Sequence, residues 1–230
     1  PNGMWTYFVS VYYMANRDSD GLLNDDRFYS FLNKITAFIW AYAVTNPGVN
    51  ALRTPIFAEM TNIVTGQPVR FSDYLFDTQK LQNAFDNYTF SNNRAITKAM
   101  LTWWAFQNSS QELLSLESVL EIEHIYARNR QEKEHSLSNP RNVESLGNKV
   151  LLEKRINIRA SDYRFSDKVK YYTGFENNQK QKKEGTKIKE LTDLAAKATD
   201  FTESDIVERN AKIILSFVTF IRNNDLLCED

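Results

Sequence analysis

Glu123, His124, Asn148 and Asn157 have the types and spacing needed to hydrolyse a phosphodiester bond. Imidazole titrates near neutral pH, so a histidine can act as the general base that activates water. A carboxylate and an amide oxygen together suit a hard divalent cation such as Mg²⁺ or Mn²⁺, which neutralises charge on the phosphate. We therefore predict His124 and Asn148 as catalytic residues, with Asn148 bracing the loop and the imidazole. Glu123 and Asn157 are predicted to bind the metal ion.

Each of these residues also has a purely structural explanation. Single histidines are more often structural than catalytic, Glu123 can be a solvent-facing strand residue, and Asn157 can lie on a helix surface. For His124, the adjacent carboxylate and the two spaced asparagines favour catalysis. The second histidine, His135, lies in a polar stretch, and we expect it to have no role. Two histidines and one cysteine, Cys228, rule out a His-rich or Cys-based zinc site and an internal disulfide.

The segments around these residues are predicted to form a strand, a loop, a strand and a helix. Residues 119–123 alternate between apolar and polar side chains over a short length, which predicts a strand. Residues 128–142 are polar without periodicity and predict a loop, whereas residues 149–152 predict a second short strand. A helix is expected to begin near Glu153. This order is the layout of a ββα-metal nuclease, in which a histidine ends the first strand.

Helical patterns dominate the rest of the chain, because apolar residues recur at spacings of three and four. Such patterns, which we interpret as core packing, occupy residues 5–14, 24–46, 50–64, 78–88, 92–107, 166–172 and 202–221. Asn24, Ser166 and a capping box from Thr202 to Asp205 are the predicted helix starts. Residues 175–185 are polar and Lys-rich, which predicts a loop.

The predicted fold class is mainly α with a small α+β insertion: a helical bundle carrying a ββα-metal (His-Me finger) nuclease motif. We expect a helical region over residues 1–117, the nuclease motif over 118–175, and C-terminal helices over 176–230 that pack on the same domain. No apolar run approaches the ~20 residues that span a bilayer, and the first residues lack the features of a signal peptide. We expect a cytoplasmic protein, and a fragment of a longer one because the chain begins with Pro1.

Charge is distributed unevenly along the chain. Residues 124–190 carry 16 Lys and Arg against 9 Asp and Glu, a net of +7, whereas residues 1–123 and 191–230 each carry a net of −4. A basic segment between acidic ones is a plausible footprint for a phosphate backbone, although a solvated charged region explains it equally well. The predicted phosphate contacts are Arg128, Arg130, Lys149, Lys154, Arg155 and Arg159. The Lys-rich run 180–183 is expected to be solvated.

Several segments together resemble the C-terminal nuclease domain of GmrSD-type restriction enzymes. They are Glu-Ile-Glu-His-Ile (121–125), Leu-Gly-Asn-Lys-Val-Leu-Leu (146–152), Asn157, Phe-Ser-Asp-Lys (165–168) and residues 201–209. The family's usual pattern is Glu-His-Ile-x-Pro, then Gly-Asn, then Asn, and the resemblance covers about residues 90–222. Ala127 stands where the family usually has Pro, so we expect a looser turn there.

This resemblance implies an HNH-type endonuclease that uses Mg²⁺ or Mn²⁺. The family implies modification-dependent DNA restriction in bacteria, a form of antiviral defence, with an N-terminal nucleotide-using domain of ParB-like fold in the full-length protein. We therefore expect a metal-dependent nuclease whose partner is DNA. The alternatives are a non-catalytic nucleic-acid-binding or regulatory module that kept the scaffold, and an RNA-cleaving toxin. Intact Glu123, His124 and Asn157 favour an enzyme, since a binding module needs none of them.

Overall fold

A computed structural model describes residues 3–48, 50–115 and 117–228 of the chain. The chain divides into two compact units, the first formed by residues 1–88 and 214–230 and the second by residues 89–213. This division differs from the predicted boundaries at 117 and 175. The difference arises because α5 (Ala95–Ala105), which we had assigned to the N-terminal helical region, packs against a strand of the second unit.

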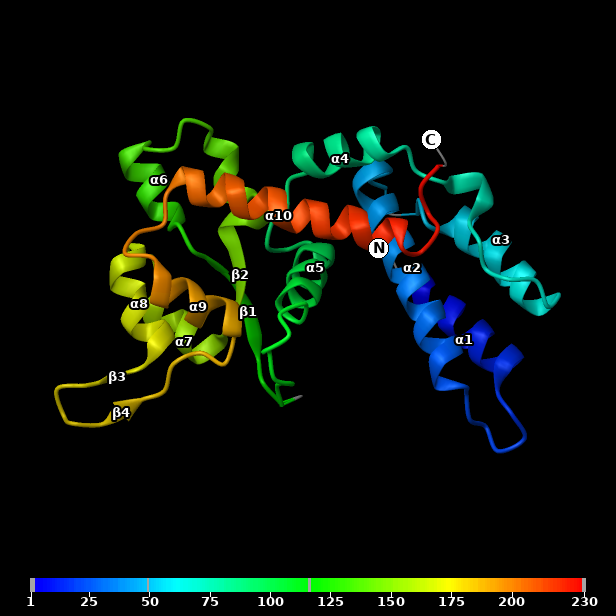
Figure 1. Cartoon of the computed structure of the whole chain (residues 1–230), viewed down its shortest axis with the longest axis horizontal. Coiled ribbons are helices and arrows are strands. Elements are labelled where there is room, and N and C mark those ends of the chain that lie inside the picture. Colours follow the sequence, from blue (N-terminus) through cyan, green and yellow to red (C-terminus); the bar gives the residue numbers. More distant parts are fainter. Residues whose placement is uncertain (1–2, 49, 116, 229–230) are drawn as a thin grey trace. The chain divides into compact units, whose positions relative to one another are not determined.

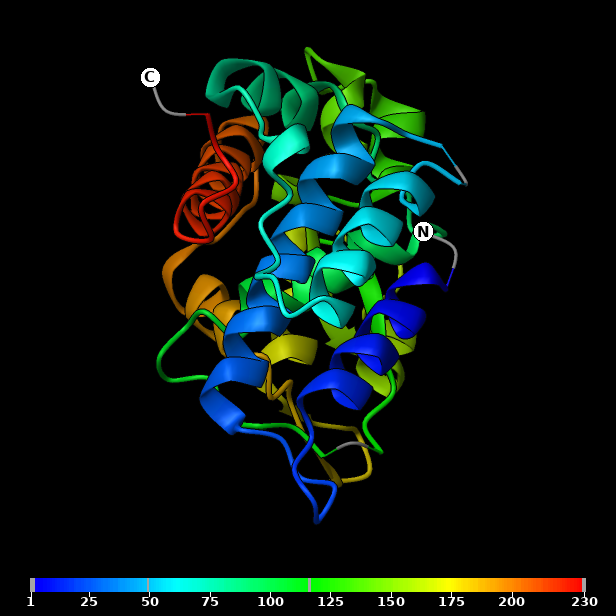
Figure 2. The same cartoon turned by 90° about the vertical axis from the view of Figure 1, so that its right-hand side faces the viewer.

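The first unit is helical. Its elements are α1 (Met4–Asn16), α2 (Asp25–Thr45), α3 (Arg53–Val64), the 3-10 helix η1 (Ser72–Tyr74), α4 (Thr78–Asn87) and the C-terminal part of α10 (Glu203–Arg222). The predicted cap is confirmed, since the Asn24 side chain accepts a hydrogen bond from Arg27 N at 3.0 Å. Aromatic rings pack between α1 and α2: Phe8 meets Phe31 edge to face, and Tyr12 stacks on the same ring. Figure 2 shows α1 beside α2 and α3, and α1 packs against α3.

The second unit combines helices with two small antiparallel sheets. Its elements are α5, β1 (Leu120–His124), α6 (Arg128–Glu134), η2 (Pro140–Glu144), η3 (Leu146–Asn148), β2 (Lys149–Glu153), α7 (Lys154–Ala160), α8 (Phe165–Thr173), β3 (Phe175–Glu176), β4 (Lys182–Lys183), α9 (Lys189–Lys197) and the start of α10. In Figure 1, α7, α8 and α9 flank one side of the β1–β2 pair and α5 flanks the other. The prediction of a mainly α fold with a small α+β part is therefore confirmed.

The strand pair places the residues that we predicted for catalysis. β1 runs antiparallel to β2, with Leu120 opposite Glu153 at one end and His124 opposite Lys149 at the other. α7 follows β2 directly and packs on both strands. The predicted order of strand, strand and helix is thus present, with His124 at the end of its strand.

The segment 128–142 is not the plain loop that we predicted. It holds α6 and the start of η2. The pattern gave no sign of α6 because this helix buries little apolar surface: its only buried residue is Gln131. Polar contacts hold it instead, since Arg130 pairs with Glu134 at 3.2 Å and Gln131 Oε1 accepts from Leu137 N at 2.9 Å. His135 ends the helix in a left-handed conformation, with φ 48°.

The C-terminal third departs from prediction in two further places. Residues 175–185 form the short β3–β4 hairpin instead of a loop, and α9 was not predicted. The predicted start of α10 is confirmed, because Asp205 Oδ2 accepts from both Thr202 N and Thr202 Oγ1. α8 begins two residues earlier than expected, with Arg164 and not Ser166 at the N-cap.

None of the helices in the described part of the chain combines the length and apolar character that crossing a bilayer requires.

Candidate active site

His124 lies buried at the end of β1, with 9% of its surface exposed. Its Nε2 atom is buried without a hydrogen-bond partner, and Glu144 Oε1 lies 3.5 Å away. Burial lowers the pKa of His124 to about 4, and Lys149 and Arg128 act in the same direction, whereas Glu144 opposes them. The imidazole is therefore neutral at pH 7, with an unused nitrogen that can accept a proton.

Beside this imidazole, Glu144 and Lys149 form an ion pair. Lys149 Nζ lies 2.5 Å from Glu144 Oε2 and also donates to Asn92 Oδ1 at 2.8 Å and to the Phe90 carbonyl oxygen. Burial tends to raise the pKa of Glu144, but the Lys149 ammonium outweighs it and the pKa is lowered. A carboxylate that stays ionised beside His124 can stabilise the imidazolium that forms when the base takes a proton.

Lys149 is accordingly not the surface cation that we predicted. Its side chain is fully buried and its ammonium is engaged inside the protein, so in this structure it does not reach a phosphate. Its position explains why: as the first residue of β2 it lies opposite His124 in the strand pair. The sequence does not single out Glu144, because a glutamate without a regular pattern around it gives no local signal.

Glu123, the predicted metal ligand, is also buried and is bound by two side chains of α8. Lys168 Nζ donates to Glu123 Oε1 at 2.5 Å and to the His124 carbonyl oxygen at 2.7 Å, and Tyr172 donates its hydroxyl to the same Oε1 at 3.1 Å. Burial raises the pKa of Glu123, and Lys168 opposes this. These donors occupy one of the two carboxylate oxygens. Lys168 is the last residue of the segment 165–168, which contributed to the family resemblance. That resemblance was the one feature of the sequence that pointed to Lys168.

Asn148 is fully buried, and its side-chain amide is bound to the main chain on both sides. Its Oδ1 accepts from Tyr126 N at 2.7 Å, and its Nδ2 donates to the carbonyl oxygens of Tyr126 and Val143 at 3.1 Å each. These contacts support the bracing role that we predicted. Next to it, Gly147 approaches α10 so closely that a Cβ atom would overlap the carbonyl oxygen of Ile206.

Asn157 faces Glu121 across the strand–helix contact. Its Nδ2 donates to Glu121 Oε2 at 3.0 Å, and Lys154 Nζ lies 3.7 Å from Glu121 Oε1. Glu121 and Glu123 are two residues apart on β1, so their side chains leave the strand on the same face. Within the described residues, no three His, Cys, Asp or Glu side chains gather as a metal site. The two ligands predicted from the sequence, Glu123 and Asn157, offer a carboxylate and an amide oxygen, the hard donors that suit a hydrated Mg²⁺.

The predicted basic residues separate into distinct places. Arg128 lies at the site, 3.6 Å from Glu144 and with half of its side chain exposed. Arg130 is engaged elsewhere, pairing with Glu134 and Asp200 and lying over the Tyr126 ring. The other three, Lys154, Arg155 and Arg159, line a groove at the far end of the strand pair.

The turn after β1 has a proline-like backbone conformation, although Ala127 stands where the family usually has proline. Ala127 has φ −63° and ψ 133°. A proline ring imposes a φ near −65°, so the backbone adopts that conformation without it. The conformation of this turn is therefore proline-like, and its looseness stays a prediction.

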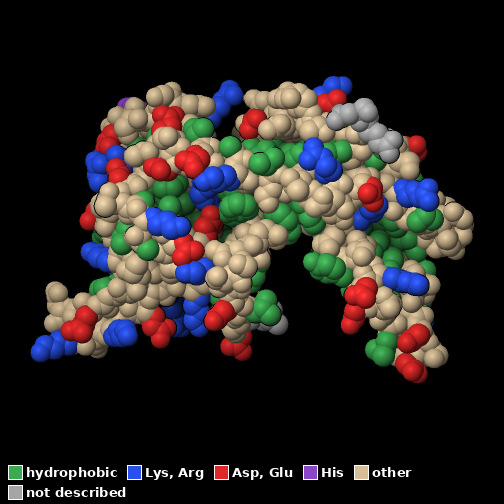
Figure 3. Space-filling view, viewed as in Figure 1, with side chains coloured by type: hydrophobic (Ala, Val, Ile, Leu, Met, Phe, Trp, Pro, Cys, Tyr) green, Lys and Arg blue, Asp and Glu red, His purple; other side chains and the backbone are tan. Residues whose placement is uncertain are grey.

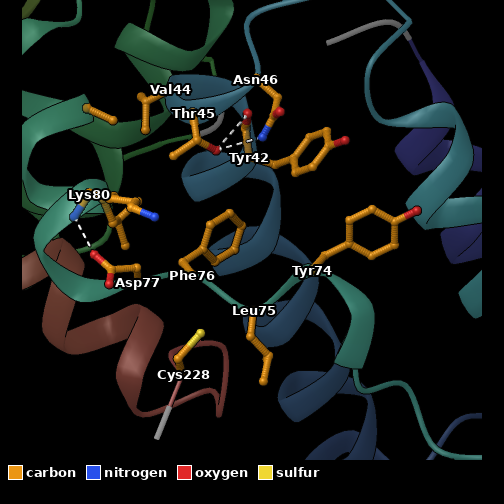
Figure 4. Close-up of a pocket in the computed structure, with 12 residues that line it drawn as sticks. Tyr42, Val44, Thr45, Asn46, Tyr74, Leu75, Phe76, Asp77, Lys80 and Cys228 are labelled. Carbon is orange, nitrogen blue, oxygen red and sulfur yellow. Dashed lines mark hydrogen bonds between the residues drawn. The ribbon is translucent and has the colours of Figure 1, made fainter. Parts of the chain in front are cut away.

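A cavity in the first unit does not provide hydrolytic groups. It is lined by Tyr42, Val44, Thr45, Asn46, Tyr74, Leu75, Phe76, Asp77, Lys80, Leu81, Ala84 and Cys228 (Figure 4). No histidine is among these residues. Its one carboxylate, Asp77, caps α4 by accepting from Lys80 N at 2.7 Å. The chemistry that the sequence predicted thus belongs to the second unit.

A strand pair followed by a helix places a buried, neutral histidine at a strand end, where it is suited to accept a proton. The sequence profile of the GmrSD restriction endonucleases, C-terminal domain, matches residues 75–215. The match covers more than half of the chain, and the chain belongs to this family. Comparisons with curated proteins and with solved structures found no match. The family places the chain among restriction endonuclease domains, which confirms the resemblance drawn from the sequence.

Proposed function

We propose that the chain is the cutting domain of a restriction enzyme, an HNH-type endonuclease that hydrolyses DNA phosphodiester bonds with the help of Mg²⁺ or Mn²⁺. Modified DNA is the proposed substrate, and the proposed setting is bacterial antiviral defence, behind an N-terminal ParB-like domain. The observation that carries the proposal is the buried Nε2 of His124, which has no hydrogen-bond partner in a chain of this family.

In the proposed reaction, His124 Nε2 takes a proton from the attacking water. The low pKa keeps the imidazole neutral before the step. The Glu144 carboxylate, 3.5 Å away, stabilises the imidazolium afterwards, and Lys149 fixes that carboxylate. Asn148 positions the segment through its contacts to Tyr126, and so it is a positioning residue.

Glu123 and Asn157 are the residues that would hold the metal ion. They supply one carboxylate and one amide from β1 and α7, and the second oxygen of Glu123 is not needed by Lys168. When bound, Mg²⁺ or Mn²⁺ would supply charge neutralisation at the phosphate and the departing oxygen. Arg128 is exposed beside His124 and is suited to contact the same phosphate.

The test compares two histidine substitutions that make the same chemical change. His124→Asn should lower the rate of plasmid nicking by about 10²–10⁴-fold, the usual contribution of a general base. His135→Asn is the matched control, because asparagine tolerates the left-handed conformation of this exposed position. Equal nicking by His124→Asn and the parent protein would refute the proposal.

A second candidate is a non-catalytic module that binds DNA. One contact favours this second candidate: the Lys168 ammonium is bound to Glu123 Oε1. One oxygen of the predicted metal ligand is therefore satisfied without a metal. Such a module would bind DNA in Mg²⁺ or Mn²⁺ but cut at no measurable rate, and His124→Asn would leave its behaviour unchanged.

A further inference from the structure

A groove lies at the end of the β1–β2 pair that is remote from His124. It is lined by Glu117, Ser118, Val119, Glu153, Lys154, Arg155, Ile156, Arg159, Lys182, Lys183, Glu184, Gly185 and Lys187. We propose that this groove binds the sugar–phosphate backbone of the DNA substrate a few nucleotides away from the bond that is cut. The proposal rests on the proposed function, since it assigns a second contact to the same substrate.

The charge of the groove suits a polyanion. Six of its lining residues are cationic and three are carboxylates. One of these carboxylates, Glu153, is already satisfied: it accepts from Thr186 Oγ1 at 2.6 Å and from Lys187 N at 2.7 Å. Figure 3 shows Lys and Arg side chains, in blue, over the β3–β4 hairpin and the adjoining part of the second unit. The run 180–183, expected from sequence to be merely solvated, thus contributes Lys182 and Lys183 to this surface.

The wall of the groove is held in place by the fold. Gly185 passes so close to α8 that a Cβ atom would overlap the Tyr172 carbonyl oxygen, and Thr186 N donates to that same oxygen at 2.8 Å. Arg159 Nη2 donates to the Glu184 carbonyl oxygen at 3.1 Å. The backbone at residues 184–186 and the Arg159 side chain are therefore in place before any ligand arrives, which lowers the ordering cost of binding.

Arg159 also has a buried N–H group, at Nε, that lacks a hydrogen-bond acceptor. Among the described residues, its Nε and His124 Nε2 are the two buried side-chain nitrogens that have no hydrogen-bond partner. A buried polar group without a partner costs free energy. A phosphate oxygen in the groove would supply an acceptor if the Arg159 side chain turned to expose Nε, and a guanidinium is the side chain best suited to bind phosphate.

The strand register sets the distance between the groove and His124. Leu120 pairs with Glu153 at the groove end, and His124 pairs with Lys149 four residues further along. Four residues at about 3.3 Å each give roughly 13 Å. A DNA strand advances about 3.4 Å per nucleotide, so the groove should contact the backbone about four nucleotides from the cut.

The first experiment measures DNA affinity by anisotropy in EDTA, so that no cutting occurs. Lys182→Ala/Lys183→Ala should weaken binding about 5- to 10-fold and reduce the slope of log affinity against log salt by about 2. Lys133→Ala/Lys212→Ala removes two exposed lysines outside the groove and should change neither quantity. Binding by the groove variant equal to that of this control would overturn the proposal. Melting temperatures of both variants should match the parent.

Two further measurements sharpen the test. Arg159→Lys keeps the charge but removes Nε, and it should weaken binding about 3-fold or more, whereas Arg155→Lys should not. On substrates with fewer than about four nucleotides on one side of the cut, the groove double variant should cut like the parent. Equal defects at every flank length would contradict the proposed position. His124→Asn should bind DNA like the parent, and cutting by that variant would refute the proposed function while leaving the binding result intact.

Discussion

Glu144 holds a carboxylate oxygen 3.5 Å from Nε2 of His124 without forming a hydrogen bond to it. The other oxygen of Glu144 is bound by Lys149, a lysine that is itself fully buried. The carboxylate is thus fixed by its counter-ion and leaves the histidine nitrogen available. The Glu144 carboxylate can therefore stabilise the imidazolium of His124 while leaving Nε2 able to accept the proton.

The first prediction concerns this ion pair. Glu144→Gln should lower the nicking rate about 10-fold or more and destabilise the fold by about 1–3 kcal/mol, because Lys149 would be left buried without a counter-ion. This loss of stability is smaller than for a fully buried pair, because Glu144 is partly exposed and water screens its charge. Glu144→Gln/Lys149→Met should regain stability but not rate, as measured by urea unfolding and nicking. A double variant that is no more stable than Glu144→Gln would argue against the pair.

The second prediction concerns the pH dependence of stability in the metal-free protein. The pKa of His124 is lowered to about 4 in the folded state from 6.5, so the unfolded chain binds the extra proton first as the pH falls. The stability present above pH 6.5 should therefore be lost progressively down to about pH 4. Between pH 7 and pH 5 the loss should be roughly 2 kcal/mol. His124→Asn, unfolded with urea in EDTA at both pH values, should lack this component, and an identical loss in both proteins would contradict it.

The third prediction concerns Lys168. Lys168→Met leaves the Glu123 carboxylate buried without its cation, and it should destabilise the protein by about 3–5 kcal/mol. Glu123→Gln/Lys168→Met removes both charges and should recover most of that loss in thermal unfolding. Lys170→Met, which changes an exposed lysine on the same helix, is the control and should shift the melting temperature little. A Lys168→Met protein as stable as this control would show that the pair contributes nothing.

The fourth prediction concerns the metal ion. EDTA should stop cutting, and Asn157→Ala should raise the Mg²⁺ concentration for half-maximal nicking by about 10-fold or more. High Mg²⁺ should restore part of the rate, because a ligand and not the base has been removed. Asn83→Ala, on the exposed face of α4, should titrate like the parent. Cutting at the parent rate in EDTA would exclude this role for Asn157.

The sequence was informative where a local pattern determined the structure. The alternation before His124 and the apolar residues 150–152 of β2 predicted the strand pair, and helical periods predicted α2 and α10. Partners brought together by folding left no such trace. Glu144 reaches the histidine from a 3-10 helix, and Lys168 reaches Glu123 from a helix 45 residues later.

Lysines were the least predictable residues of the site. Lysine is almost always exposed, so a basic excess is naturally assigned to the surface. Here Lys149 and Lys168 lie in the interior, each paired with a carboxylate. The hairpin at 175–185 was missed for a different reason: its strands have two residues each, too few for a period to register.

Gly147 and Asn148 are held by contacts that the fold itself requires, whereas Nε2 of the proposed base His124 is not. The glycine is required by the neighbouring backbone of Ile206, and the asparagine by the main chain at Tyr126 and Val143. His124 has no comparable structural duty at its Nε2. A descendant that abandoned catalysis would be free to replace the histidine while still needing the Gly-Asn pair. A relative that keeps the Gly-Asn pair but lacks the histidine would therefore be expected to have the same fold without the proposed catalysis.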